Sequence, residues 1–162
     1  MRVYLGADHQ GFFLKNKISE YLAKAGYSIT DYSEESYRPD DDFPQYAEAA
    51  ARRVVDEEDD TDVAILICGG GQGMAMAANR IKGVRAIVAT NVDDARYGRN
   101  DNDANVLCLP ARVLDNMQGD FVWKDIVDTF LTTPFAGSER YIRRNRQLDK
   151  ISPTLTDTTN NS

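Results

Sequence analysis

The chain has 162 residues, of which 42% are hydrophobic and 28% charged, and its net charge at pH 7 is −7. This length and composition indicate one globular domain with a hydrophobic core. The acidic balance argues against non-specific nucleic-acid binding, which needs a basic surface. No apolar run approaches the roughly 20 residues that a membrane-spanning helix requires.

Two cysteines, Cys68 and Cys108, are too few for a disulfide framework, so we expect a cytoplasmic protein. The amino-terminal segment, residues 1–6, has the pattern of a short strand that turns polar at Asp8, which is unlike a signal peptide. One histidine and two separated cysteines do not make a metal-ligand set, so no metal site is expected.

Strand and helix patterns alternate along the chain. Apolar and β-branched runs predict five strands, at 3–6, 27–32, 62–68, 84–89 and 105–109. Apolar residues at helical spacing and helix-forming composition predict helices at 11–25, 46–55, 74–79, 93–99, 114–131 and 138–151. The alternation indicates an α/β fold, a three-layer α-β-α sandwich around a Rossmann-like five-stranded parallel sheet. Residues 1–151 form one predicted domain, and the polar end, residues 152–162, is predicted to be disordered.

The strand at 62–68 ends in Cys68 and is followed at once by a glycine-rich turn, residues 69–73. Glycines leave the backbone N–H groups of such a turn unobstructed. The turn comes at the carboxyl edge of the sheet, where α/β folds bind their ligands, and is suited to an oxyanion or a phosphate. The candidate binding residues in it are Gly69, Gly70, Gly71 and Gly73.

Alternatives stay open for both features. The turn could be only a tight connection, and it fits a dinucleotide fingerprint poorly because Met74 stands where a third glycine or alanine belongs. Cys68 could be a nucleophile, a general base or an inert buried thiol, although nearby N–H groups would favour its thiolate. Cys108 has no such turn and is expected in the core.

Further candidates lie at the ends of other elements. Asp8 and His9 close the first strand at the same sheet edge as Cys68, and His9 could be structural or ligand-facing. Arg140 and Arg144 share one helical face, either as a solvated basic surface or as a phosphate clamp, because guanidinium groups match phosphate oxygens. Arg112, just after the fifth strand, could join such a clamp. The acidic segments 40–42 and 56–60 are predicted to be solvated turns.

Several of these residues fall into ordered motifs: Gly6-Ala-Asp-His-Gln-Gly11, Ile67-Cys-Gly-Gly-Gly-Gln-Gly73 with Ala78-Asn79, Asn102-Asp-Ala-Asn105 and Arg140-Tyr-Ile-Arg-Arg144. In kind and order they resemble the type B ribose-5-phosphate isomerases, a family that includes the galactose-6-phosphate isomerase subunits. The resemblance covers residues 1–151. It implies the sandwich fold and an aldose–ketose isomerase of sugar phosphates that needs no metal or other cofactor. It also implies a homodimer or homotetramer with sites built across the subunit interface.

The resemblance also implies roles for individual residues. A cysteine at the position of Cys68 is the base that removes the proton next to the carbonyl, which gives a cis-enediolate. Amides of the turn at 69–73 would hold the developing negative charge. The remaining residues would bind the substrate: Asp8, His9 and Asn102 its hydroxyls or phosphate, and Arg112, Arg140 and Arg144 its phosphate, in part from the neighbouring subunit.

Three positions depart from the family pattern. Gly70 replaces a threonine or serine, Asp101 replaces a histidine, and Tyr141 replaces a second histidine. The histidine at position 101 is assigned to opening the furanose ring, helped by the hydroxyl that Gly70 lacks. Asp101 could replace that histidine as the acid for ring opening in an ordinary ribose-5-phosphate isomerase, although a carboxyl group is normally a poor acid at neutral pH.

These departures suggest two further hypotheses. A tetrose 4-phosphate or its ketose cannot close a furanose ring, so such a substrate would need no ring opening. A non-catalytic sugar-phosphate binding or regulatory protein is the alternative, although such a protein has no need of the thiol of Cys68. A nucleotide-binding Rossmann module is a third class, but its fingerprint is missing.

Overall fold

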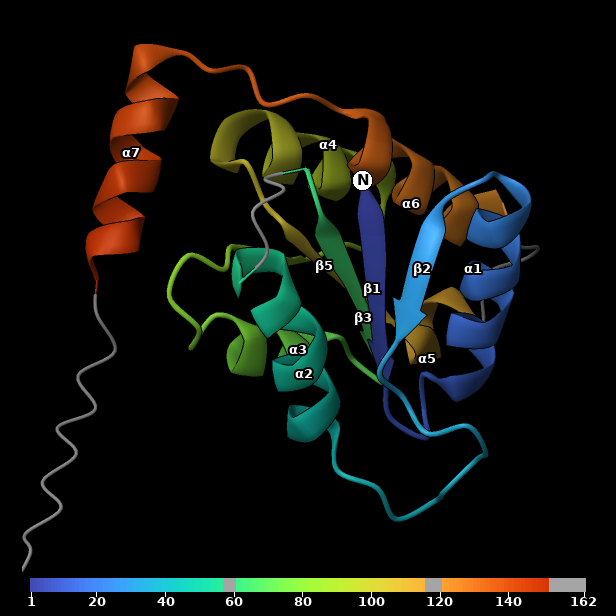
Figure 1. Cartoon of the computed structure of the whole chain (residues 1–162). Helices are drawn as coiled ribbons and strands as arrows, with labels where there is room; N and C mark the ends of the chain where they lie inside the picture. The colour runs from blue at the N-terminus through green and yellow to red at the C-terminus, as the bar shows by residue number, and fades with distance from the viewer. Residues whose placement is uncertain (57–60, 116–120, 152–162) are drawn as a thin grey trace, which may run out of the picture.

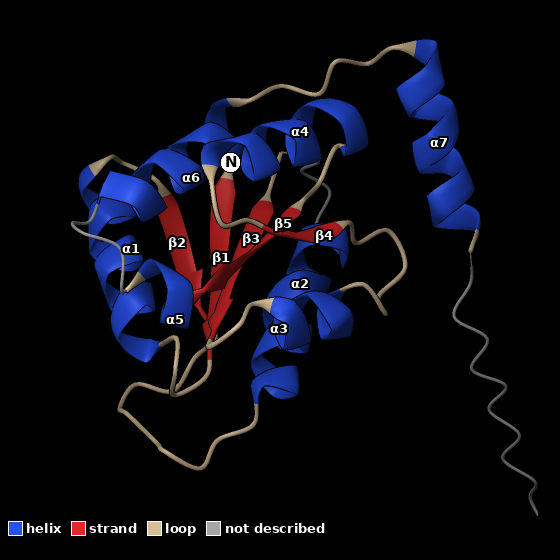
Figure 2. Ribbon diagram, turned by 180° about the vertical axis from the view of Figure 1, so that it is seen from behind, coloured by secondary structure: helices blue, strands red, loops and turns tan. Residues whose placement is uncertain are grey.

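The computed structural model describes residues 1–56, 61–115 and 121–151. It contains one five-stranded sheet in which every neighbouring pair is parallel, in the order β2-β1-β3-β5-β4 (Figures 1 and 2). The strands are β1 (Arg2–Ala7), β2 (Ser28–Asp31), β3 (Val63–Cys68), β4 (Ala86–Val88) and β5 (Val106–Pro110). The predicted α/β class and the five parallel strands are confirmed.

Helices cover both faces of the sheet (Figures 1 and 2). The described helices are α1 (Phe12–Lys24), α2 (Phe43–Asp56), α3 (Gln72–Ala78), α4 (Val92–Asn102), α5 (Ala111–Leu114), α6 (Phe121–Thr132) and α7 (Glu139–Lys150). Because strand side chains alternate, Leu5 and Ile65 pack under α1, α4, α5 and α6, whereas Tyr4 and Leu66 pack under α2 and α3. The central strand β3 is buried along its whole length between these layers, which explains its continuous apolar run.

The order of the strands reverses between β1 and β3. After β1 the chain forms α1 on one face and continues to β2, whereas after β3 it forms α3 on the other face and continues towards β4 and β5. The two connections therefore diverge at the carboxyl ends of β1 and β3. This is the crevice in which open α/β sheets bind ligands.

The prediction of one long helix at 114–131 is wrong. Leu114 ends the short helix α5, and a separate helix, α6, begins at Phe121. Leu114 and the apolar side of α6 contribute to the same core, so one apolar pattern spans two helices. The predicted acidic turn at 56–60 falls largely, and the predicted disordered tail at 152–162 wholly, outside the described residues.

Helix α7 stands apart from the sheet, reached by an extended segment that follows α6, and both views show this separation (Figures 1 and 2). Its one buried residue is Asn145. Near its carboxyl end it is tied to the body by Arg85, whose guanidinium lies 3.2 Å from the Asp149 carboxylate. In the part of the chain that the structure describes, no helix is long and apolar enough to cross a membrane.

Candidate functional site

Cys68 lies at the carboxyl end of β3, where the strand order reverses. Its side chain is nearly buried, with 6% of the residue exposed. The backbone N–H of Gly71 donates a hydrogen bond to Sγ over 3.2 Å. A donor in this position stabilises negative charge on sulfur, so the environment suits a thiol that works as a base.

The glycine turn that follows Cys68 requires glycine at some positions and not at others. Gly71 has φ +72°, in the left-handed region that favours glycine, directly before α3. A Cβ at Gly73 would meet the ring of Phe43 at 2.7 Å. A Cβ at Gly70 would meet nothing within 4 Å, so a hydroxyl-bearing residue at this position would fit without a clash.

Asp8 comes directly after β1 and faces the same crevice. Its backbone N–H donates to the carbonyl of Ile67, which places it beside the end of β3. Its carboxylate is almost buried and accepts hydrogen bonds from the amides of Gln10 (3.0 Å) and Gly11 (3.1 Å). Burial raises the pKa of Asp8 more than these hydrogen bonds lower it, so its surroundings disfavour the ionised form of the carboxyl group.

His9 is held by a residue that the sequence analysis did not select. Oδ1 of Asp41 accepts the backbone N–H of His9 over 2.9 Å and lies 2.8 Å from its ring Nδ1. The prediction that residues 40–42 form a solvated turn is therefore wrong for Asp41, whose side chain is only 6% exposed. Asp40 and Asp42 are exposed as expected.

Arg112 completes this edge of the sheet. Its backbone N–H donates to the carbonyl of Gly69 over 3.0 Å, and its Nε donates to the side-chain oxygen of Gln10 over 2.6 Å. Gln10 is a second residue that the sequence did not single out. Gln10 holds the Arg112 guanidinium over the start of the glycine turn. A Cβ at Gly69 would lie only 2.8 Å from Nε of Arg112.

Asp101 and Asn102 lie at the opposite edge of the sheet. They end α4, and the Asn102 carbonyl accepts a hydrogen bond from Nε of Arg85, the residue that precedes β4. β3 has six residues, so the two edges are about 17 Å apart at the usual rise per residue. One copy of the chain therefore does not bring Asp101 or Asn102 to Cys68.

Arg140 and Arg144 lie on α7, and both are exposed. Arg140 packs its guanidinium over the ring of Tyr141, with 5.1 Å to the ring centroid. Figures 1 and 2 place α7 away from α5 and from the carboxyl ends of the strands. The predicted site residues thus form two groups, one around Cys68 and one at the other edge of the sheet and on α7.

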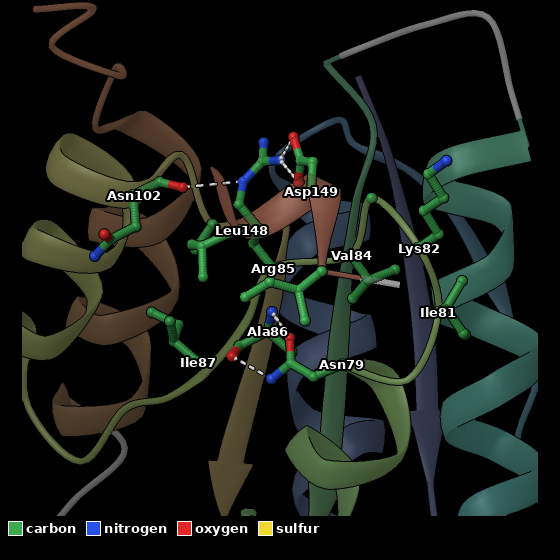
Figure 3. A pocket seen from close by; sticks show the side chains of 13 residues that line it. Asn79, Ile81, Lys82, Val84, Arg85, Ala86, Ile87, Asn102, Leu148 and Asp149 are labelled. Atoms are coloured by element: carbon green, nitrogen blue, oxygen red, sulfur yellow. Dashed lines mark hydrogen bonds and ion pairs between the residues drawn. The ribbon is translucent and has the colours of Figure 1, made fainter. Parts of the chain in front are cut away.

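A cavity of about 390 Å³ lies beside the second group, between α7 and the edge strand β4 (Figure 3). Ile81, Ile87 and Leu148 give it an apolar lining, and Ile151, 72% exposed, extends that lining at the end of α7. The guanidinium of Arg85 crosses it between the Asn102 carbonyl and the carboxylate of α7 described above. No residue of the Cys68 group lines this cavity.

Residues 1–56, 61–115 and 121–151 contain no group of three or more His, Cys, Asp or Glu side chains that could hold a metal ion. The second thiol, that of Cys108 on β5, is completely buried in the core layer under α2 and α3, as predicted.

Comparison with known proteins places the chain among sugar-phosphate isomerases. A family model described as Ribose/Galactose Isomerase matches residues 3–151. Ribose-5-phosphate isomerase B of Mycobacterium leprae is 38% identical over 144 residues, which are 89% of this chain and 85% of that protein. A putative sugar phosphate isomerase of Bacillus subtilis is 34% identical over 152 residues, 94% of this chain and 95% of its own.

Solved structures agree with this result. Ribose-5-phosphate isomerase B of Clostridium thermocellum superposes with a TM-score of 0.85 at 38% identity, over 93% of this chain and 97% of that one. Ribose-5-phosphate isomerase B of Mycoplasma genitalium, solved with bound ribulose-5-phosphate, gives 0.83 at 35% identity over 91% and 93%.

Proposed function

The chain belongs to the ribose/galactose isomerase family, and from this premise we propose that it interconverts the aldose and ketose forms of a phosphorylated sugar, with Cys68 as the base. The observation that carries the proposal is the position of the Cys68 thiol. It lies at the reversal of the strand order, beside Asp8, and its sulfur accepts a hydrogen bond from the backbone N–H of Gly71.

The proposed reaction is a proton transfer between two neighbouring carbons. The thiolate of Cys68 removes the proton from the carbon next to the carbonyl, and the electron pair moves onto the carbonyl oxygen to give a cis-enediolate. The hydroxyl proton of the neighbouring carbon then moves to the former carbonyl oxygen, so that the neighbouring carbon becomes the new carbonyl. The abstracted proton, or one from solvent, is delivered to the former carbonyl carbon. Backbone amides of the turn at 69–73 would stabilise the enediolate charge, which is often the largest contribution to such catalysis. No cofactor is needed for these steps.

The separation of the two residue groups supports a site shared between two copies. Arginines suit a phosphate through their planar guanidinium groups, yet Arg140 and Arg144 lie on the detached α7. In a two-fold dimer the same contact occurs twice, so α7 of each copy can serve the Cys68 crevice of the other. The apolar cavity beside α7, with its exposed Ile151, fits burial against a second copy.

The substrate is proposed to be ribose 5-phosphate and ribulose 5-phosphate, with a tetrose 4-phosphate and its ketose as the second candidate. The solved relative with bound ribulose-5-phosphate supports the first. Asp101 and the hydroxyl-free Gly70 favour the second, because both positions are assigned to ring opening. For a ring-forming sugar, Asp101 of the neighbouring copy would supply the acid for ring opening.

Proton NMR in D₂O with a panel of tetrose, pentose and hexose phosphates tests this function. We expect isomerisation with deuterium incorporated at the former carbonyl carbon, which receives a proton from solvent. Good turnover of ribose 5-phosphate would select the first candidate, and turnover of tetrose phosphates alone would select the second. Bound sugar phosphate that exchanges no proton would contradict an isomerase and favour a binding protein.

A further inference from the structure

The segment between β2 and α2, residues 32–42, crosses the carboxyl edge of the sheet and brings Asp41 against His9, 32 positions away in the sequence. A single carboxylate oxygen of Asp41 accepts both the backbone N–H and the ring Nδ1 of His9, at 2.9 and 2.8 Å. The Asp41 side chain is almost completely buried, whereas that of His9 keeps 25% of its surface exposed. The buried member of the pair is therefore the carboxylate, and the imidazole is the part that remains accessible.

Asp41 is an anion that can only accept hydrogen bonds. Burial raises the pKa of this carboxyl, but hydrogen bonds from the His9 amide and imidazole and from the Tyr46 hydroxyl outweigh burial, so the pKa lies below its usual value. The pKa of Tyr46 is raised to about 12 by burial and by this carboxylate, so the phenol keeps its proton and remains a donor. Because an ionised carboxylate offers no proton, Nδ1 of His9 must carry one.

The segment that carries Asp41 is fastened at other points. The hydroxyl of Ser33 accepts the backbone N–H of Ala7 over 2.8 Å, at the end of β1. Farther along, the ring of Tyr37 stacks on that of Phe13, with 5.8 Å between centroids and 22° between planes, and meets Phe12 edge-on. These contacts attach the segment to β1 and α1 before it reaches His9, so the position of the Asp41 carboxylate is set by the fold.

We propose that Asp41 is a positioning residue, which holds His9 through Nδ1 so that Nε2 is the ring nitrogen that meets an oxygen of the sugar phosphate. Nε2 accepts a hydrogen bond when the ring is neutral and donates one when the ring is protonated. Asp41 itself does not touch the substrate. The identity of the ligand rests on the proposed function, whereas the state of the imidazole does not.

The state of the imidazole can be measured directly, because His9 is the only histidine in the chain. Long-range ¹H–¹⁵N NMR of ¹⁵N-labelled protein, purified without a histidine tag, gives the signals of one imidazole. In the neutral ring we expect the proton on Nδ1, and we expect it to move to Nε2 in Asp41→Ala. A wild-type ring protonated on Nε2 would overturn the proposal even if the variant fails to fold.

A double-mutant cycle tests whether Asp41 acts through His9. We expect Asp41→Asn and His9→Gln each to lower kcat/KM for the sugar phosphate about tenfold, mainly by raising KM. The first change replaces the charged acceptor of the Nδ1 hydrogen bond by a neutral amide, and the second removes the imidazole. The double variant should lose no more than either single variant, because both changes remove one interaction. Asp40→Asn, an exposed neighbour, is the matched control and should keep wild-type kinetics.

If the double variant lost kcat/KM by the product of the two single losses, Asp41 would act independently of His9, which would contradict the inference. So would an Asp41→Asn variant that behaves like Asp40→Asn. A wild-type protein inactive on every sugar phosphate would instead refute the proposed function. The NMR result would then decide the inference alone.

Discussion

The two cysteines have the same side chain in different surroundings. Cys68 lies at the end of β3, where the Gly71 amide donates to its sulfur and the strand order reverses. Cys108 lies on β5 against the same layer of core residues, with no exposed surface. Burial, with a smaller contribution from the nearby Cys68, raises the pKa of Cys108, so that thiol stays neutral. Cys68 is therefore the candidate for the proposed base, and Cys108 is not.

Replacing each cysteine by alanine should separate these roles. We expect Cys68→Ala to lower turnover by at least about 10²- to 10⁴-fold, the usual contribution of a general base, with little change in stability. Cys108→Ala should keep its activity and lose about 1 kcal/mol of stability, because a buried sulfur is removed from the core. Enzyme kinetics and thermal unfolding of both variants provide the measurement. Full activity of Cys68→Ala would place the base elsewhere.

At the level of elements, the turn between β3 and α3 determines how the crevice is shaped. Gly71 takes a left-handed conformation and approaches Val88 and β5 closely, with a Cβ expected 3.2 Å from Val88 Cγ1. Gly70, one residue earlier, faces open space. The conformation of Gly71 is therefore a structural requirement, whereas the absence of a side chain at Gly70 leaves room that a substrate or a second copy can occupy.

Alanine at each of these two glycines should have different consequences. Gly71→Ala should destabilise the protein by about 1–2 kcal/mol, the cost of a left-handed conformation with a Cβ. Gly70→Ala should stay within about 0.5 kcal/mol of the wild type, as for an unconstrained surface position. Urea unfolding of the two variants compares them directly. Equal losses of stability would contradict the conformation described for the turn.

Local sequence patterns predicted most elements and failed where partners are distant. Apolar runs placed all five strands, and the Cys68 turn was predicted at the sheet edge where it lies. The helix at 114–131 was wrong because Leu114 and α6 share one core. Asp41 was assigned to solvent because its partner, His9, is remote in the sequence. Gln10 carried no local signal for its contact with Arg112.

At the scale of the whole molecule, the predicted site residues form two groups on different sides of the chain. The Cys68 crevice lies at the carboxyl edge of the sheet, while Asp101 and Asn102 lie at the amino edge and the clamp arginines on α7. The sequence motifs identified these residues but could not predict their separation in space. That separation depends on the path of the extended segment between α6 and α7 (Figure 1). The homodimer with a shared site that we propose would bring them together.

Complementation between two inactive variants tests this account most directly. Cys68→Ala lacks the base and Arg144→Ala lacks part of the clamp, so each should be nearly inactive alone as a homodimer. Co-expressed at equal levels, half of the dimers would be mixed, and each mixed dimer would contain one intact site.

We therefore predict that the co-expressed pair regains about one quarter of wild-type turnover. Arg140→Ala with Arg144→Ala is the control and should regain none, since both changes lie in the same group of site residues. A Cys68→Ala and Arg144→Ala pair that forms mixed dimers yet stays as inactive as its parents would contradict a site shared between two copies.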